Sequence, residues 1–297
     1  MRTLVTGGAG FIGTNLIKRL LKDGHEVVSV DNYSTGKEEN HQEGCRYWDY
    51  DLSDRYCPVL DRNEYDIIYH IGALARIQPS IKKPLTHIKN NFVSTLNVLE
   101  QARLNNIPVV YAGSSSKHHG LYGSPYAWSK FSGEELCRLY SSVYDVSTSI
   151  CRFYNVYGPH QLEDGPYCTV VGVFMNQYKD GIPLTITGNG EQRRDFTHVD
   201  DIVDGLVRVS RAMHGEVDMR YAGEEFELGR GVNHSMNEVA DMFGENYPRE
   251  YIPARKGEYD RTLCEDKRAH ELLDWNPIIN LDDHIRDFVE TERFLNE

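Results

Sequence analysis

The sequence lacks the features that would point to a membrane or a nucleic-acid partner. No apolar run approaches the roughly 18 residues that a membrane-spanning helix needs. The start, Met-Arg-Thr-Leu-Val-Thr, does not read as a signal peptide, so we expect no membrane partner and a cytoplasmic location. Basic residues are also few: 32 Lys and Arg stand against 45 Asp and Glu, a formal net charge of −13. That balance argues against a general nucleic-acid binder.

Cysteine is sparse, and the sequence shows no internal repeat or Ser/Gly linker. The six cysteines form no Cys-x-x-Cys pair, so neither a disulfide framework nor a zinc site is expected. His118 and His119 would point apart on a strand, and no third ligand is suitably spaced, so we predict no metal site. The 297 residues suit one large α/β unit or two closely joined domains.

The first thirty residues have the pattern of a dinucleotide-binding unit. An apolar strand at 2–6 leads into the glycine-rich turn 7–13, and Leu16, Ile17 and Leu20 then repeat at helical spacing. A second strand at 26–30 ends in Asp31. Glycines allow the backbone to approach a pyrophosphate, and an acid at this distance is typical of a ribose contact that would repel the 2′-phosphate of NADP. The alternative is a tight turn that serves packing alone.

A second pattern joins a tyrosine, a lysine and a run of serines. Tyr126 and Lys130 are four residues apart, which places them on the same face of a helix. Ser124 and Pro125 are typical of the start of that helix. The serines at 114–116 follow an apolar stretch, 107–113, that resembles a buried parallel strand. An ammonium near a phenol favours the phenolate, so the sequence predicts that Tyr126 acts as a base.

Strands and helices alternate along the first half of the chain. This alternation predicts an α/β fold, a Rossmann-type doubly wound parallel sheet with a smaller α/β substrate-binding domain. We expect residues 1–155 to form the dinucleotide-binding domain, with the chain returning to it around 184–212, and residues 156–297 to form mainly the substrate-binding domain. Further expected elements are strands at 66–70, 147–154 and 184–187 and helices at 85–104, from 165–166 through 178, and at 281–294.

Four motifs occur in the order of a known family. They are Thr-Gly-Gly-Ala-Gly-Phe-Ile-Gly at 6–13, Tyr-x-x-x-Lys at 126–130, Arg-Phe-Tyr-Asn at 152–155 and Arg-Asp-Phe-Thr-His-Val-Asp-Asp at 194–201. From Met1 to Pro277 the chain resembles the extended short-chain dehydrogenase/reductases that act on nucleotide sugars, most of all the UDP-glucose (UDP-galactose) 4-epimerases. The resemblance implies an enzyme with tightly bound NAD and a nucleotide-diphosphate sugar as its partner.

The resemblance also assigns residues to the cofactor. The implied NAD contacts are Gly7, Gly10, Phe11, Ile12 and Gly13 at the turn, Asp31 and Asn32 at the adenosine ribose, Asp51 and Leu52 at the adenine, and Ala73, Tyr126 and Lys130 toward the nicotinamide.

The same resemblance implies the catalytic and substrate residues. Ser115 matches the catalytic serine by its distance to Gly120, with Ser114 and Ser116 as rivals, and it acts with Tyr126 and Lys130. The implied contacts to the substrate's nucleotide diphosphate are Asn155, Arg194, Arg255 and Glu258. Simpler interpretations stay open: Arg194 as a surface ion pair with Asp195, Arg255 in a solvated loop, and Asn155 as a turn cap.

Three departures from the family pattern bear on the sugar. Lys-His-His-Gly at 117–120 replaces the usual x-x-x-Tyr-Gly, and the loop between Ser115 and Tyr126 is shorter than usual. Thr262 stands where glucose-specific members often carry a bulky tyrosine. A small residue there would leave room for a 2-acetamido group.

The expected reaction is reversible C4 epimerisation of a UDP-hexose, UDP-glucose/UDP-galactose or their N-acetylated forms, through a 4-keto intermediate. No Asp or Glu follows Ser116 until Glu134, whereas dehydratases and decarboxylases of this family use a carboxylate there. A 4,6-dehydratase or an epimerase for another nucleotide remains an alternative, and an NAD-sensing binding protein is the non-enzyme alternative. Apolar residues on more than one face of the helices at 85–104 and 126–144, which family members pair into a four-helix bundle, predict a homodimer.

Overall fold

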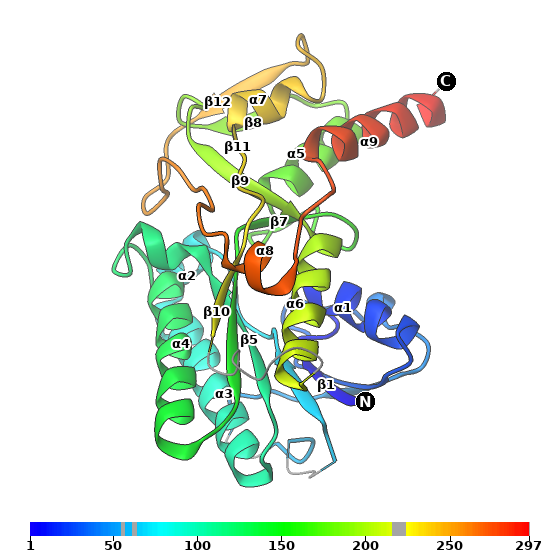
Figure 1. Ribbon diagram of the computed structural model, residues 1–297. Coiled ribbons are helices and arrows are strands. Elements are labelled where there is room, and N and C mark those ends of the chain that lie inside the picture. The colour runs from blue at the N-terminus through cyan, green and yellow to red at the C-terminus, as the bar shows by residue number, and fades with distance from the viewer. Residues whose placement is uncertain (55–56, 61–63, 216–223, 297) are drawn as a thin grey trace.

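A seven-stranded parallel sheet forms the centre of the protein (Figure 1). The computed structural model describes residues 1–54, 57–60, 64–215 and 224–296. The strand order is β10-β6-β5-β4-β1-β2-β3. From β1 the chain adds strands first on one side of the sheet and then, starting with β4, on the other, and doubly wound sheets bind ligands at this switch point between β1 and β4. The predicted Rossmann-type fold is therefore confirmed. The strands are β1 (Arg2–Thr6), β2 (Glu26–Asp31), β3 (Cys45–Asp49), β4 (Ile67–His70), β5 (Val109–Ser114), β6 (Thr148–Phe153) and β10 (Glu225–Leu228).

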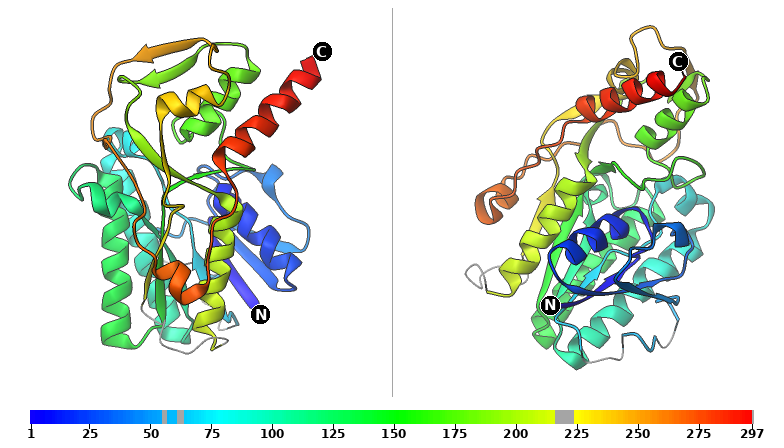
Figure 2. Two further views of the ribbon diagram at one scale, coloured as in Figure 1. Left: turned by 45° about the horizontal axis from the view of Figure 1, so that its top comes forward. Right: turned by 90° about the vertical axis from the view of Figure 1, so that its right-hand side faces the viewer.

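Helices cover both faces of this sheet (Figures 1 and 2). α1 (Phe11–Lys22) and α6 (Val199–Met213) lie on one face, and α3 (Pro84–Asn105) and α4 (Pro125–Tyr144) lie on the other. A hydrophobic core lies on each face of the sheet, and neighbouring residues of β1 pack into different cores. Val5 belongs to the core with Leu16, and Leu4 belongs to the core with Leu99. A six-residue helix that the sequence did not predict, α2 (Ile77–Lys82), follows the exit of β4 and is too short to show a helical repeat.

A smaller unit stands at the carboxyl ends of the central strands (Figure 1). Its core lies among Tyr157, Phe174, Phe196, Phe243 and Ile285. β8 (Leu184–Thr187), at the start of the 184–212 segment, pairs with β12 (Arg249–Ile252) in this unit, whereas α6, α8 (Arg268–Leu273) and β10 lie with the central sheet. Further elements are β7 (Asn155–Tyr157), β9 (Arg193–His198), β11 (Asn233–Ser235), α5 (Val170–Lys179), α7 (Met236–Asp241), α9 (Leu281–Asn296) and the 3-10 turns η1 (Glu38–Asn40) and η2 (Ser115–His119).

The helix predicted from residues 165–166 begins later. Thr169 caps α5: its side chain accepts a hydrogen bond from the Gly172 N–H at 3.0 Å, so the helix starts at Val170. Residues 166–169 are thereby left as a loop that lines a cavity between the two units. Across the residues that the structure describes, no helix is both long and apolar enough to cross a membrane.

A buried ionic cluster connects β6, β10 and α4. Arg152 on β6 is only 3% exposed, and its guanidinium donates to both carboxylate oxygens of Glu134, at 2.9 and 2.7 Å, and to Glu227 at 2.8 Å. Glu225 pairs with Arg152 and Arg138 at the rim of the cluster. Burial opposes the charge of Arg152, but the glutamates raise its pKa above the usual range. Glu134 is fully buried, so this pairing is what makes its charge tolerable.

We expect Arg152→Met to lower the free energy of unfolding by about 3–5 kcal/mol, because it leaves the carboxylate of Glu134 buried without its main partner. Arg138→Met is the matched control: Arg138 binds the same cluster from a more exposed position and should cost about 1 kcal/mol or less. Urea unfolding of the three proteins measures the difference. Equal losses in the two variants would contradict the role given to Arg152.

Candidate active site

The turn between β1 and α1 forms one wall of the cavity. Gly7 has a φ of +70°, and a Cβ there would lie 2.6 Å from the Cα of Gly72 at the exit of β4. A Cβ on Gly13 would lie 2.1 Å from the carbonyl oxygen of Gly7. Because both positions exclude any side chain, the turn stays tight and the start of α1 borders a cavity of about 500 Å³. Its lining includes the predicted residues Gly7, Gly10, Phe11, Ile12 and Gly13.

Polar groups at the ends of β2 and β3 continue this wall. The carboxylate of Asp31 accepts N–H bonds from Ala9 at 3.0 Å and Tyr33 at 2.9 Å, and burial raises its pKa. A carboxylate has lone pairs left after two such bonds, so Asp31 can still accept from a diol. Asn32 donates to Asp51 at 3.0 Å. Asn32, Asp51, Leu52 and Ala73 all line the cavity, so the structure brings together every predicted residue of the adenosine end and of the turn.

The start of α4 brings the phenol of Tyr126 to the end of β5. The Ser124 side chain accepts the Ala127 N–H at 3.1 Å and Pro125 takes the first turn, which confirms the predicted helix start. The phenol of Tyr126 donates a long hydrogen bond, 3.4 Å, to the hydroxyl of Ser114, which also accepts from the Ser116 hydroxyl at 2.9 Å. Ser115 lines the same cavity. Within the described residues no hydrogen bond joins Ser115 to Tyr126, so the structure favours the rival Ser114 as the partner of the phenol.

Lys130 lies one turn after Tyr126 and is 5% exposed. Its ammonium stands over the ring of Tyr111, 4.4 Å from the ring centre, and it forms no ion pair with a described residue. Burial lowers the pKa of Lys130 to about 8, although Glu134 one turn further on favours the charge. The lysine is therefore largely protonated at pH 7 and close to its own titration.

The smaller unit supplies the opposite wall. Asn155 donates to the carbonyl of Asp195 at 3.0 Å and to the hydroxyl of Thr262 at 3.2 Å. Thr262 is 4% exposed and also accepts the Asp195 N–H, so it holds Asn155 in place. The carboxylate of Asp195 accepts three backbone N–H bonds, from Arg230, Gly231 and Cys264, and no ion pair with Arg194 is found in the described part of the chain. The interpretation of Arg194 as a surface ion pair with Asp195 is thus not supported.

Two arginines and a glutamate complete this wall. Arg194 donates to the carbonyl of Arg193 at 2.9 Å, and burial lowers its pKa while Glu258 opposes the shift. Arg255 is half exposed and lies 3.9 Å from Glu258, a loose ion pair that leaves its charge accessible. Asn155, Arg194, Arg255 and Glu258 all line the cavity.

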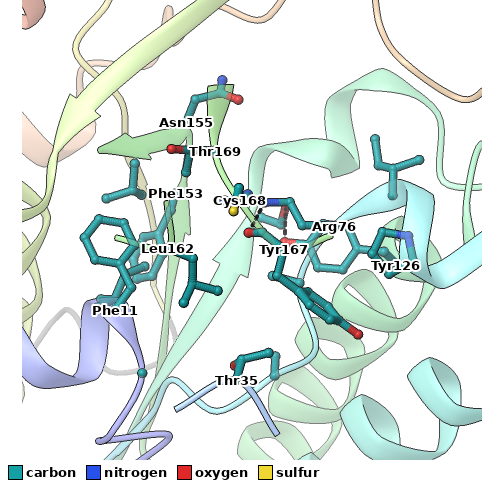
Figure 3. A pocket seen from close by; sticks show the side chains of 18 of the residues that line it. Phe11, Thr35, Arg76, Tyr126, Phe153, Asn155, Leu162, Tyr167, Cys168 and Thr169 are labelled. Atoms are coloured by element: carbon teal, nitrogen blue, oxygen red, sulfur yellow. Dashed lines mark hydrogen bonds between the residues drawn. The ribbon is translucent and has the colours of Figure 1, made fainter. Parts of the chain in front are cut away.

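Sequence reasoning missed several residues of the cavity. Arg76, Tyr167 and Cys168 gather near Tyr126 (Figure 3), and the ring of Tyr259 lies tilted against that of His119 in the short loop, with ring centres 5.0 Å apart. Arg76 could have been identified from the sequence as a basic residue just after the end of a predicted central strand. His118 bonds Glu227 at 2.8 Å, and no group of three possible metal ligands occurs among the residues with described positions.

Comparison with known proteins finds similar sequences and structures over nearly the whole chain. Residues 3–221 match the NAD dependent epimerase/dehydratase family. The chain is 33% identical to a UDP-glucose 4-epimerase of Mycolicibacterium smegmatis, over 98% of both chains, and 30% identical to a UDP-N-acetyl-alpha-D-glucosaminuronate decarboxylase of Bacillus cytotoxicus, over 92% of this chain and 94% of that one. A solved UDP-glucuronic acid 4-epimerase from Bacillus cereus, in complex with UDP-glucuronic acid and NAD, is 26% identical with a TM-score of 0.88, over 99% of this chain and 100% of that one.

The buried lysine predicts a pH-dependent stability. The pKa of Lys130 is about 8 in the folded protein and about 10.4 in an unfolded chain. Between these values the unfolded chain binds more protons, so the free energy of unfolding should rise with pH in the wild type relative to Lys130→Met, by roughly 2–3 kcal/mol from pH 8 to 10.5. Urea unfolding of both proteins without ligand measures this gain, and parallel pH curves would contradict it.

Proposed function

The chain belongs to the NAD dependent epimerase/dehydratase family, and from this premise we propose that it catalyses reversible C4 epimerisation of a UDP-hexose. It is an NAD-dependent enzyme of nucleotide-sugar chemistry. The observation that carries the proposal is the meeting of Tyr126, Lys130 and a serine hydroxyl in a cavity where the Ser-Ser-Ser-Lys-His-His stretch at 114–119 holds no carboxylate. Loss of water from C5 and C6 would need an acid or base there.

The chain's own residues suit the cofactor. The glycine turn and the start of α1 would hold the pyrophosphate, because Cβ atoms at Gly7 and Gly13 are sterically excluded and the backbone lies open. Asp31 and Asn32 would take the adenosine ribose, Asp51 and Leu52 the adenine, and Ala73, Tyr126 and Lys130 the nicotinamide side. Bound NAD supplies a hydride acceptor and donor for interconverting the C4 alcohol and the ketone.

Tyr126 is proposed as the group that takes and returns the proton of the 4-hydroxyl. Lys130, buried one helical turn after Tyr126, is proposed to assist this proton transfer through its charge. A serine hydroxyl hydrogen-bonds the sugar oxygen as its charge develops. Ser115 is the assignment from resemblance, and Ser114 is the alternative that the Tyr126 bond favours.

Asn155, Arg194, Arg255 and Glu258 are proposed to hold the nucleotide diphosphate at the wall of the smaller unit. Charge-assisted hydrogen bonds to the two arginines would keep the diphosphate fixed while the sugar presents either face. The small, buried Thr262 supports the proposal that a 2-acetamido group is accepted. A 4,6-dehydratase, or an epimerase for another nucleotide, is the second candidate because similar solved structures include a dTDP-glucose 4,6-dehydratase.

The test is the fate of UDP-sugars incubated with the NAD-loaded enzyme and resolved by chromatography and NMR. A C4 epimer of UDP-glucose or UDP-N-acetylglucosamine, without release of NADH, is the expected product. A 4-keto-6-deoxy sugar would overturn epimerisation, and conversion only of GDP- or dTDP-sugars would overturn the choice of nucleotide.

Tyr126→Phe should lower kcat by roughly two to four orders of magnitude, because the variant lacks the group that exchanges the proton. NAD binding, measured by calorimetry, should stay within a few-fold of the wild type. A variant whose turnover is within tenfold of the wild type would show that another group moves the proton.

We also propose a homodimer formed through α3 and α4. The outer face of α4 exposes Trp128, Leu139 and Val143, which recur at helical spacing. Light scattering at micromolar concentration should give the mass of a dimer, and Leu139→Glu together with Val143→Glu should give a monomer. A wild-type monomer would contradict the proposal.

A further inference from the structure

Arg76 is a cation of the cavity that no described carboxylate neutralises. Arg76 follows the exit of β4, lines the cavity, and donates its Nε–H to the carbonyl of Tyr167 at 3.0 Å. No described carboxylate forms an ion pair with it. Figure 3 shows Arg76 at the same part of the cavity as Tyr126 and Cys168.

The position of Arg76 is costly to the fold in two ways. Its φ of 103° with ψ of 137° lies where only glycine is unstrained. Burial lowers its pKa, and the groups that oppose this shift are the phenol of Tyr126 and the thiol of Cys168. A guanidinium still keeps its charge at pH 7, so it sits partly desolvated without a compensating anion. Strain and an unpaired charge at one residue of a ligand cavity point to a ligand that repays both.

The location narrows the chemistry of that ligand. A nucleotide sugar carries anionic charge at its diphosphate, which is attached at C1, and on any acid group of the sugar. Under the proposed function, Arg194 and Arg255 on the smaller unit serve the diphosphate, and Tyr126 meets the 4-hydroxyl. The C1 and C4 positions lie at opposite ends of a pyranose ring. A cation beside Tyr126 is therefore near the substituents on C3 and C5, the two carbons bonded to C4, and of these only the C5 substituent can be a carboxylate.

We propose that Arg76 forms a carboxylate subsite for the C5 substituent, so that a UDP-linked hexuronic acid is preferred over a neutral UDP-hexose. The inference rests on the proposed function for the location of C4 and deepens it by naming the sugar class. Arg76 is then a specificity-determining residue: its planar guanidinium binds the carboxylate and holds the ring with its 4-hydroxyl toward Tyr126.

The experiment compares UDP, UDP-glucose and UDP-glucuronate in calorimetric titrations of the NAD-loaded protein, followed by turnover assays. The wild type should bind UDP-glucuronate at least tenfold more tightly than UDP-glucose. Arg76→Gly is the informative variant, because glycine accepts the positive φ without strain while the side chain, with its guanidinium and its bond to the Tyr167 carbonyl, is removed. It should weaken UDP-glucuronate about 10- to 100-fold while leaving UDP and UDP-glucose within about threefold.

Two further variants complete the design. Arg76→Lys keeps the charge but not the planar fork, and it should recover part of the loss. Arg286→Ala removes an exposed arginine on α9, outside the cavity, and should leave all three titrations unchanged. Thermal melting checks that Arg76→Gly is folded, and its Tm should not fall below that of the wild type.

The outcomes separate this inference from the proposed function. Equal binding of UDP-glucose and UDP-glucuronate by the wild type, or an Arg76→Gly variant that loses affinity for both alike, would overturn the carboxylate subsite while a C4 epimer still supports epimerisation. A guanidinium-dependent preference for UDP-glucuronate with a pentose product would support the subsite and overturn epimerisation. No binding of UDP itself would overturn the choice of nucleotide and, with it, this inference.

Discussion

The contact between Arg152 and Glu134 is the constraint on which the geometry of the site depends. Tyr126, Lys130 and Glu134 follow one another at intervals of four, so they share one face of α4. Arg152 reaches from β6 and binds both oxygens of the buried Glu134 carboxylate. Because Arg152 fixes Glu134, it also fixes the rotation of α4 about its axis. The phenol of Tyr126 and the ammonium of Lys130, on the same face, are thereby directed toward β5.

The same cluster explains the unusual loop after the serines. Lys117 lies 3.5 Å from Glu225 and 3.8 Å from Glu134, and His118 bonds Glu227 at 2.8 Å. The departure from the family pattern at 117–119 thus has a structural basis, since these side chains anchor a short loop to the ionic cluster. One consequence is that the loop brings no carboxylate to the sugar side of the cavity, which is the basis for preferring epimerisation over dehydration.

The cationic side chains around the cavity differ in how their charge is compensated. Arg152 is saturated by glutamates and belongs to the fold, whereas Arg194 and Arg255 face Glu258, and Arg76 forms no ion pair with any acid in the described part of the chain. A structural arginine is typically paired when buried, so the uneven compensation separates residues that support the fold from those available to an anionic ligand. In a chain of strongly negative net charge, such local cations are what an anionic nucleotide sugar requires.

The sequence by itself determined the parts of the protein that depend on local spacing. The glycine turn, Asp31 after β2, the capped start of α4 and the Tyr126–Lys130 pair are each set by residues within one or two turns of each other, and the alternation of strands and helices determined the sheet. Only the tertiary structure decided that Ser114 meets Tyr126, that Thr262 holds Asn155, that Glu134 is paired with Arg152, and that Arg76 lies beside Tyr126 with no ion pair to a described carboxylate. These contacts join segments far apart in the chain, and they depend on side-chain direction and packing between strand ends, which no periodicity in the sequence records.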